Sequence, residues 1–141
     1  MPLKHYSHWL PRLRLFFFVL SIVWASPYSL IGILVGGIGC LTGGRMQRKG
    51  CALEFHGGAT NLFLKHICGE WVSAITFGHT ILGQNPELLE NSREHEWVHV
   101  RQYMRWGPLF GPAYVLSSII VWCQGKRFYR DNHFEREAYG D

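Results

Sequence analysis

The fold is decided by residues 85–108, which read Asn85-Pro-Glu-Leu-Leu-Glu-Asn-Ser-Arg-Glu-His-Glu-Trp-Val-His-Val-Arg-Gln-Tyr-Met-Arg-Trp-Gly-Pro108. Asn85 suits a helix N-cap, and Pro86 suits the first helical position. Acidic residues come early in the stretch and basic residues late, as the helix dipole favours. Gly107 followed by proline is a typical helix end. These signals predict one helix between Asn85 and Gly107.

A metal-binding motif lies inside this helix, where the sequence reads His95-Glu96-Trp97-Val98-His99. Residues four apart share one helix face, so both imidazoles can reach one ion, and zinc accepts two such nitrogen ligands. In an H-E-x-x-H motif the glutamate acts as general base on the metal's water. The pattern therefore predicts one Zn²⁺ bound by His95 and His99, with Glu96 as the catalytic residue. The alternative is that two ordinary histidines form hydrogen bonds on a helix face.

A catalytic zinc usually has a third protein ligand, and two glutamates near the carboxyl terminus are candidates. Glu135 is the stronger candidate, because the 36 residues after His99 allow an intervening helix and a return to the site. Glu137 is the rival. Glu135 also has a structural interpretation, since Asn132-x-x-Glu135 matches a capping box.

The motif followed by a helix of the Glu-x-x-Ala type resembles the gluzincin metallopeptidases, including the membrane-bound Ste24-like endopeptidases. The resemblance implies Glu135 as the third ligand, with Ala138 at the alanine position. Tyr139 stands where these enzymes have an aspartate, while Glu137 with Asp141 keeps the spacing but loses the alanine. Four segments also resemble a small, uncharacterised family of bacterial membrane-associated proteins: His95–Tyr103, Arg105–Phe110, Tyr129–Asn132 and Phe134–Tyr139. With the positive-inside rule for the basic flanks, we expect the bacterial inner membrane with the metal site on the cytoplasmic side.

The amino-terminal region has no charged residue from Leu15 to Gly44. Pro27 divides it into two parts, Leu15–Ala25 and Tyr28–Thr42, about 16 and 22 Å long as helices. Each is shorter than the roughly 30 Å hydrocarbon core of a bilayer. One kinked spanning helix and a helical hairpin are both compatible, and basic residues at both ends favour the hairpin. A signal peptide cleaved after Ala25 is a further alternative.

Two other features point to the membrane. Gly32, Gly36, Gly39 and Gly43 would form one helix stripe, which in lipid allows a partner helix to approach closely, although a flexible glycine-rich turn is the alternative. Basic residues also flank the apolar runs, as is typical of contacts with lipid headgroups and not of a nucleic-acid partner. These residues are Lys4, Arg12, Arg14, Arg45, Arg48, Lys49, Lys126, Arg127 and Arg130.

The chain has the length of one domain, which we divide into a membrane-associated segment, 1–44, and a minimal zincin-like metal-binding domain, 45–141. The expected fold is α+β and mainly helical: an N-terminal apolar helix or helical hairpin, a short β-hairpin, and the H-E-x-x-H helix packed against C-terminal helices. The expected strands are Leu53–His56 and Ala74–Leu82, the second with a bulge at Gly78. An apolar segment, Leu109–Cys123, either packs as core with some lipid contact or lies shallowly in the membrane. A last helix carries His133–Tyr139.

These features suggest a membrane-associated zinc peptidase that acts on a peptide or protein substrate. The edge of strand Ala74–Leu82 would hold the extended substrate, and Tyr103, His133 or Tyr139 would supply an oxyanion donor. A non-catalytic zinc-binding membrane protein acting through a protein partner is the alternative. A membrane module without metal is the third hypothesis.

Overall fold

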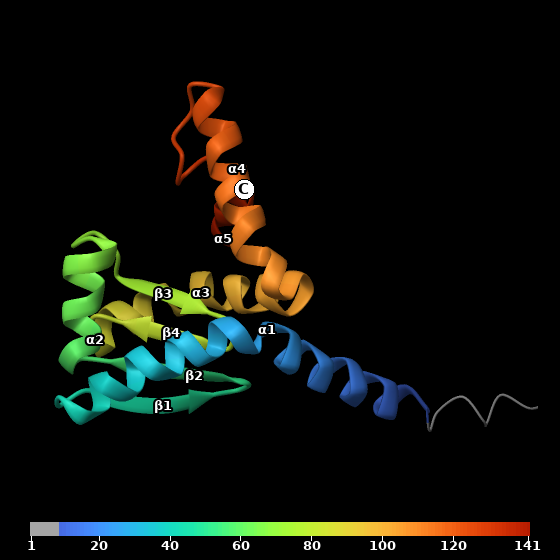
Figure 1. Ribbon diagram of the computed structural model, residues 1–141, viewed down its shortest axis with the longest axis horizontal. Coiled ribbons are helices and arrows are strands. Elements are labelled where there is room, and N and C mark those ends of the chain that lie inside the picture. The colour runs from blue at the N-terminus through green and yellow to red at the C-terminus, as the bar shows by residue number, and fades with distance from the viewer. Residues whose placement is uncertain (1–8) are drawn as a thin grey trace, which may run out of the picture.

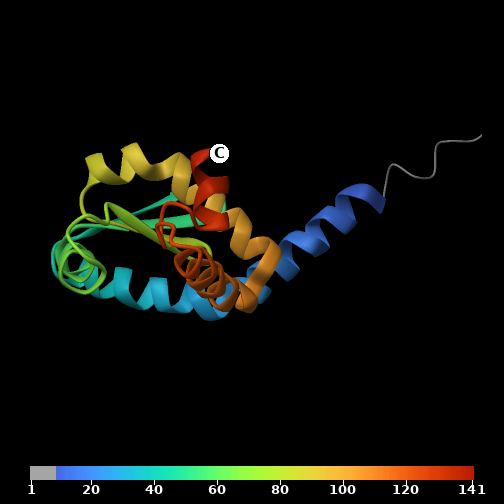
Figure 2. The same cartoon turned by 90° about the horizontal axis from the view of Figure 1, so that it is seen from above.

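The computed structural model describes residues 9–141, and the body of the molecule has three layers (Figures 1 and 2). Helix α1 (Trp9–Leu41) covers one face of a four-stranded sheet, and α3 (Pro86–Trp106) covers the other. This arrangement confirms the expected mainly helical α+β fold. Lys4, from the predicted basic flank, lies outside the described residues.

The sheet has the order β1-β2-β4-β3, so β4 is central and β3 lies at an edge. Strands β2 and β4 are parallel, while the β1–β2 and β3–β4 pairs are antiparallel. Side chains of β4 point alternately to the two faces, and all four of its residues are buried. The strands are β1 (Arg45–Lys49), β2 (Ala52–His56), β3 (Ala74–Phe77) and β4 (Thr80–Gly83).

The structure corrects one predicted strand and adds elements that were not expected. Residues 74–82 do not form one bulged strand; they form the hairpin β3–β4, because the chain reverses at Gly78 with φ of 61°. That conformation favours glycine, and a Cβ there would lie 2.3 Å from Ser29 Oγ of α1. The exposed strand β1 was missed, since its residues are mostly basic. Helix α2 (Gly58–Phe63) and the π-helix η1 (Leu64–Cys68) connect β2 to β3.

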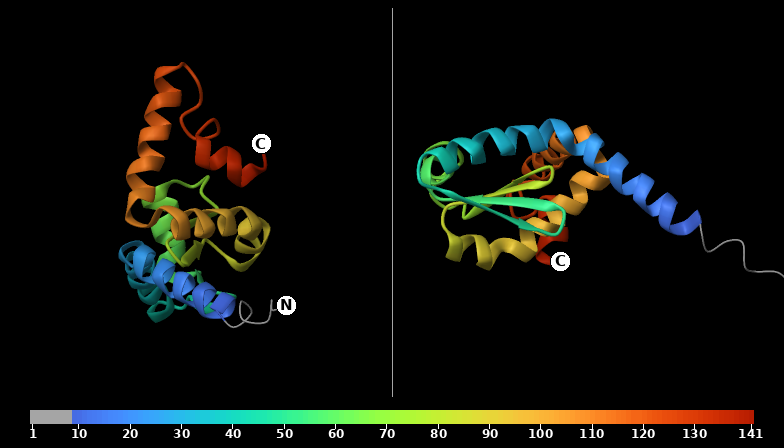
Figure 3. Two further views of the ribbon diagram at one scale, coloured as in Figure 1. Left: turned by 90° about the vertical axis from the view of Figure 1, so that its right-hand side faces the viewer. Right: turned by 90° about the horizontal axis from the view of Figure 1, so that it is seen from below.

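Helix α1 is one continuous helix, so the helical hairpin that the flanking charges favoured is wrong. Pro27 lies inside it and removes one backbone hydrogen bond, and the helix axis changes direction between its two halves (Figure 3). The Ser29 hydroxyl donates to the Ala25 carbonyl at 3.2 Å in this region. The helix continues past the proline because its second half is held against the sheet.

Glycines let α1 approach the sheet closely. A Cβ on Gly32 would lie 1.6 Å from Thr80 Oγ1, and a Cβ on Gly36 would lie 2.3 Å from the Phe55 ring. Gly39 makes a similarly close approach to a threonine of α2. The close packing that the glycine stripe allows is therefore used within the chain at these three positions.

Two helical segments extend away from this body. The first half of α1 points outward, and α4 (Phe110–Cys123) rises from the end of α3 through the short 3₁₀ helix η2 (Gly107–Leu109) (Figures 1 and 3). Of the α4 residues only Phe110 is buried, so packing of this segment against α3 is confined to its start. The chain then returns to place α5 (His133–Tyr139) beside α3.

The projecting helices expose many large apolar side chains. By length and composition, two helical stretches, Pro11–Leu41 and Pro86–Cys123, could cross a membrane. The apolar part of the second is α4, whose 14 residues span only about 21 Å. The exposed apolar residues include Leu15, Phe16, Phe17, Val23, Leu30, Leu34, Val115, Leu116, Ile120 and Trp122.

Candidate metal centre

Helix α3 is fixed at its start and along its inner face. The Asn85 side chain accepts a hydrogen bond from the Leu88 amide at 2.8 Å, which confirms the predicted N-cap. Leu89 and Val100 are fully buried against the sheet. Arg93 also reaches across to the sheet. The helix is therefore held firmly against the sheet.

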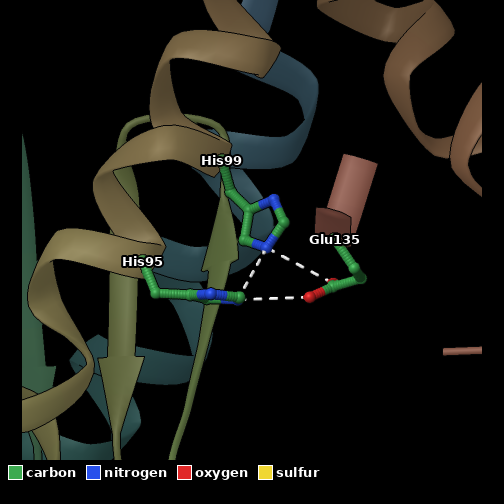
Figure 4. A group of neighbouring side chains, drawn as sticks. All are labelled: His95, His99 and Glu135. Carbon is green, nitrogen blue, oxygen red and sulfur yellow. Dashed lines mark hydrogen bonds and ion pairs between the residues drawn. The ribbon is translucent and has the colours of Figure 1, made fainter. Parts of the chain in front are cut away.

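The structure brings His95, His99 and Glu135 together, and Figure 4 shows their side chains converging from α3 and α5. The two imidazole Nε2 atoms are 3.1 Å apart. His95 Nε2 lies 3.2 Å from Glu135 Oε2, and His99 Nε2 lies 3.3 Å from Glu135 Oε1. Two imidazole nitrogens and the two oxygens of one carboxylate thus form a compact cluster between two helices.

The spacings between these residues are compatible with a zinc site. Ligand atoms bound tetrahedrally at about 2.0–2.1 Å lie about 3.3 Å from one another. The carboxylate is buried, and its Oε2 makes no hydrogen bond of normal geometry. Two imidazole nitrogens and one carboxylate oxygen are also a common ligand set for zinc. The three residues could therefore hold one divalent metal ion.

Glu137 does not join this cluster. It accepts hydrogen bonds from Gln102 at 2.9 Å and from Arg105. The capping-box interpretation of Glu135 is also wrong, because the backbone N–H of Asn132 donates to the Tyr129 carbonyl and not to the Glu135 side chain. Glu135 instead accepts a hydrogen bond from the Tyr114 hydroxyl at 2.6 Å.

No protein-family model, curated protein or solved structure matches this chain.

The histidines and the glutamates at the site favour one another's charged forms. Burial opposes ionisation of Glu135, but contacts with His95 and His99 outweigh it and hold the pKa of this carboxyl well below its usual value. Burial likewise opposes protonation of His99, while Glu135 and the charge of Glu96 raise the pKa of His99 overall. The carboxylate is thus kept ionised, which is the form that binds a cation.

Glu96 lines the same space as the three potential ligands. Its side chain is buried, and its Oε2 accepts a hydrogen bond from the Thr76 hydroxyl of β3 at 2.7 Å. Burial raises the pKa of Glu96, although the nearby histidines and Thr76 act in the opposite direction. A raised carboxyl pKa is typical of groups that both accept and return a proton near neutral pH.

A cavity of about 860 Å³ connects these groups. The edge strand β3 forms one wall, while α1, α3, α4 and α5 contribute further lining residues. Two of the three residues considered as oxyanion donors, Tyr103 and Tyr139, line it, whereas His133 is not among its described lining residues. Tyr139, at the position of the gluzincin aspartate, packs its ring 4.5 Å from that of His95.

Three supporting residues were not identified from the sequence: Thr76, Gln102 and Tyr114. Gln102 lies three positions after His99 on the helix, a spacing at which side chains meet. It could therefore have been found from the sequence. Thr76 and Tyr114 come from distant segments, and no local pattern links them to the motif.

Proposed function

We propose that this chain is a membrane-associated zinc metallopeptidase. One observation carries the proposal: His95, His99 and Glu135 form a cluster that could hold one metal ion, and Glu96 lines the same cavity. A purely structural site needs no carboxylate between the two histidines, so the presence of a buried glutamate beside them favours catalysis.

In this proposal His95, His99 and Glu135 hold the ion. Bound zinc would supply Lewis-acid polarisation of a carbonyl and acidify a water molecule. Glu96 accepts a proton from the attacking water and donates it to the leaving amine, so it is unchanged after the cycle. Thr76 fixes one oxygen of the Glu96 carboxylate and so orients the group for both transfers.

The position of β3 supports a peptide substrate. This strand pairs with β4 on one side only, and Ser73, Ala74, Ile75, Thr76 and Phe77 all line the cavity. An extended peptide can add to such an edge through backbone hydrogen bonds. Its scissile bond would then lie along the wall that carries Thr76, next to Glu96.

Association with a membrane is proposed from the exposed apolar surfaces of α1 and α4. Continuous apolar surface of this kind marks contact with lipid or protein. From the resemblance noted above and the basic flanks of the apolar runs, we propose the bacterial inner membrane with the metal site on the cytoplasmic side. The full chain should then stay in the membrane fraction after extraction at alkaline pH, and release into the soluble fraction would contradict this location.

The decisive experiment replaces Glu96 by glutamine. The purified wild-type protein should contain one zinc per chain and cleave fluorescent casein. Glu96→Gln should keep the zinc and lose about 10²–10⁴-fold in turnover. Glu87→Gln, which removes an exposed carboxylate in the first turn of the same helix, is the matched control and should keep full activity.

Two results would change the conclusion. Absence of stoichiometric zinc from the wild-type protein would refute the proposed metal centre. Bound zinc with equal turnover in wild type and Glu96→Gln would favour the non-catalytic zinc-binding protein that acts through a partner.

A further inference from the structure

The Gln102 side chain makes three hydrogen bonds beside the candidate metal centre. It has no solvent exposure. Its Oε1 lies 2.8 Å from His99 Nδ1, and its Nε2 donates to the Phe134 carbonyl at 3.0 Å and to Glu137 Oε2 at 2.9 Å. One amide on α3 therefore contacts a potential ligand on its own helix and two groups of α5.

These partners determine how the amide is oriented. Both neighbours of Nε2 are acceptors only, because one is a carbonyl and the other a carboxylate. The NH₂ group must face α5, and the carbonyl oxygen must face His99. That oxygen can only accept a hydrogen bond, so His99 Nδ1 must carry a proton.

The protonation of Nδ1 has a consequence for metal binding. A neutral imidazole with hydrogen on Nδ1 has a free lone pair on Nε2. His99 Nε2 is the atom that faces His95 and Glu135. In the neutral ring, the contact with Gln102 thus favours the tautomer whose Nε2 can act as a ligand.

We infer that Gln102 is a positioning residue for the metal centre, which fixes the His99 tautomer and ties α5 to α3 so that Glu135 stays beside the histidines. The inference rests on the proposed metal centre for its function. It also assigns a role to Glu137, which holds the Gln102 amide and is held in turn by Arg105. Metal affinity and the docking of α5 are then coupled through one side chain.

The first test needs no metal. Side-chain ¹⁵N NMR of the metal-free protein, at a fixed pH high enough that the His99 ring is neutral, reports which nitrogen of His99 carries the hydrogen. Wild type should show the Nδ1–H form, and Gln102→Leu should lose it. A wild-type His99 in the Nε2–H form would overturn the inference even if the protein binds zinc, whereas failure of zinc binding alone would sink only the proposed function.

The second test measures zinc affinity by competition with a chelator. Gln102→Leu should weaken zinc binding about 10–100-fold, the usual effect of removing a partner that orients a ligand. Gln84→Leu is the matched control, because Gln84 is also buried and its amide donates to the Glu70 and Val72 backbone carbonyls and not to a potential ligand. It should lower thermal stability and leave zinc affinity unchanged.

A milder variant covers the case in which Gln102→Leu does not fold. Glu137→Ala removes one of the two acceptors of the Gln102 amide and leaves the Phe134 carbonyl. Zinc affinity should then fall several-fold, by less than in Gln102→Leu, with one ion still bound. The inference would be overturned if Gln102→Leu and Glu137→Ala, where they fold, both bind zinc with wild-type affinity. It would also be overturned if Gln84→Leu lost as much zinc affinity as Gln102→Leu.

Discussion

Replacing Arg93 by methionine should destabilise the fold strongly, because it leaves a charge buried in the sheet. Glu54 of β2 is fully buried. Its Oε1 accepts from Arg93 Nε at 2.8 Å, and its Oε2 accepts from Arg93 Nη2 at 3.0 Å and from Gln47 at 2.8 Å. In Arg93→Met only Gln47 remains to stabilise the carboxylate. Loss of one partner of a buried ion pair costs about 3–5 kcal/mol.

We expect the lower end of this range, about 3 kcal/mol, because the Arg93 side chain keeps 15% exposure and water can reach part of the site. At about 2–4 °C per kcal/mol for a chain of this size, the midpoint of thermal unfolding should fall about 6–12 °C. Circular dichroism of the detergent-solubilised protein measures this midpoint.

Two further variants test the reasoning behind that value. Glu90→Ala removes the exposed partner of Arg93 and should change the midpoint little. Glu54→Leu combined with Arg93→Met removes both charges and should recover most of the loss. A midpoint in Arg93→Met equal to that of Glu90→Ala would refute the assignment of Glu54 as a buried charge that needs its partner.

Two predictions concern the third ligand and the close approach of α1. Glu135→Ala should lose stoichiometric zinc on dialysis while Glu137→Ala retains one ion per chain, as metal analysis would show; the reverse result would reassign the ligand. Gly36→Val should cost about 1–3 kcal/mol in unfolding free energy, because a Cβ there would lie 2.3 Å from the Phe55 ring. Gly37→Val, where a Cβ meets nothing within 4 Å, is the control and should be nearly neutral.

The features that were predicted correctly depend on neighbours in the sequence. Helix α3 was located from its N-cap, its charges and its terminal glycine, all within 24 residues of one another. The facing of His95 and His99 follows from helix periodicity alone. The overall balance of helix and strand followed from the same local patterns.

The features that were missed depend on distant packing. Gly78 was recognised as an interruption, but whether it makes a bulge or a reversal is decided by the pairing of β3 with β4 and by contact with α1. The continuity of α1 through Pro27 was missed for a similar reason, since the sheet holds the second half of the helix. Charge patterns at the ends of a segment do not contain that information.

The choice between Glu135 and Glu137 depends partly on the local sequence and partly on distant packing. Two residues apart on α5, they point to different sides of the helix, so only one can face His95. Spacing from the motif favoured Glu135. The rotation of α5 that places it inward is set by burial of Phe134 and by the hydrogen bonds of Gln102. Neither contact is visible in the local sequence.

The candidate metal centre and the exposed apolar surface lie on opposite sides of helix α4. On its inner side α4 supplies Phe110, which packs 4.3 Å from the Tyr103 ring, and Tyr114, whose hydroxyl donates to Glu135 at 2.6 Å. On its outer side Leu116 and Trp122 are more than half exposed. In water such a surface favours self-association, whereas a bilayer solvates it without disturbing the inner contacts. Tyr114 is hydrogen-bonded to a potential ligand, so the position of α4 affects the position of Glu135. We therefore expect the metal geometry to depend on the lipid that surrounds α4.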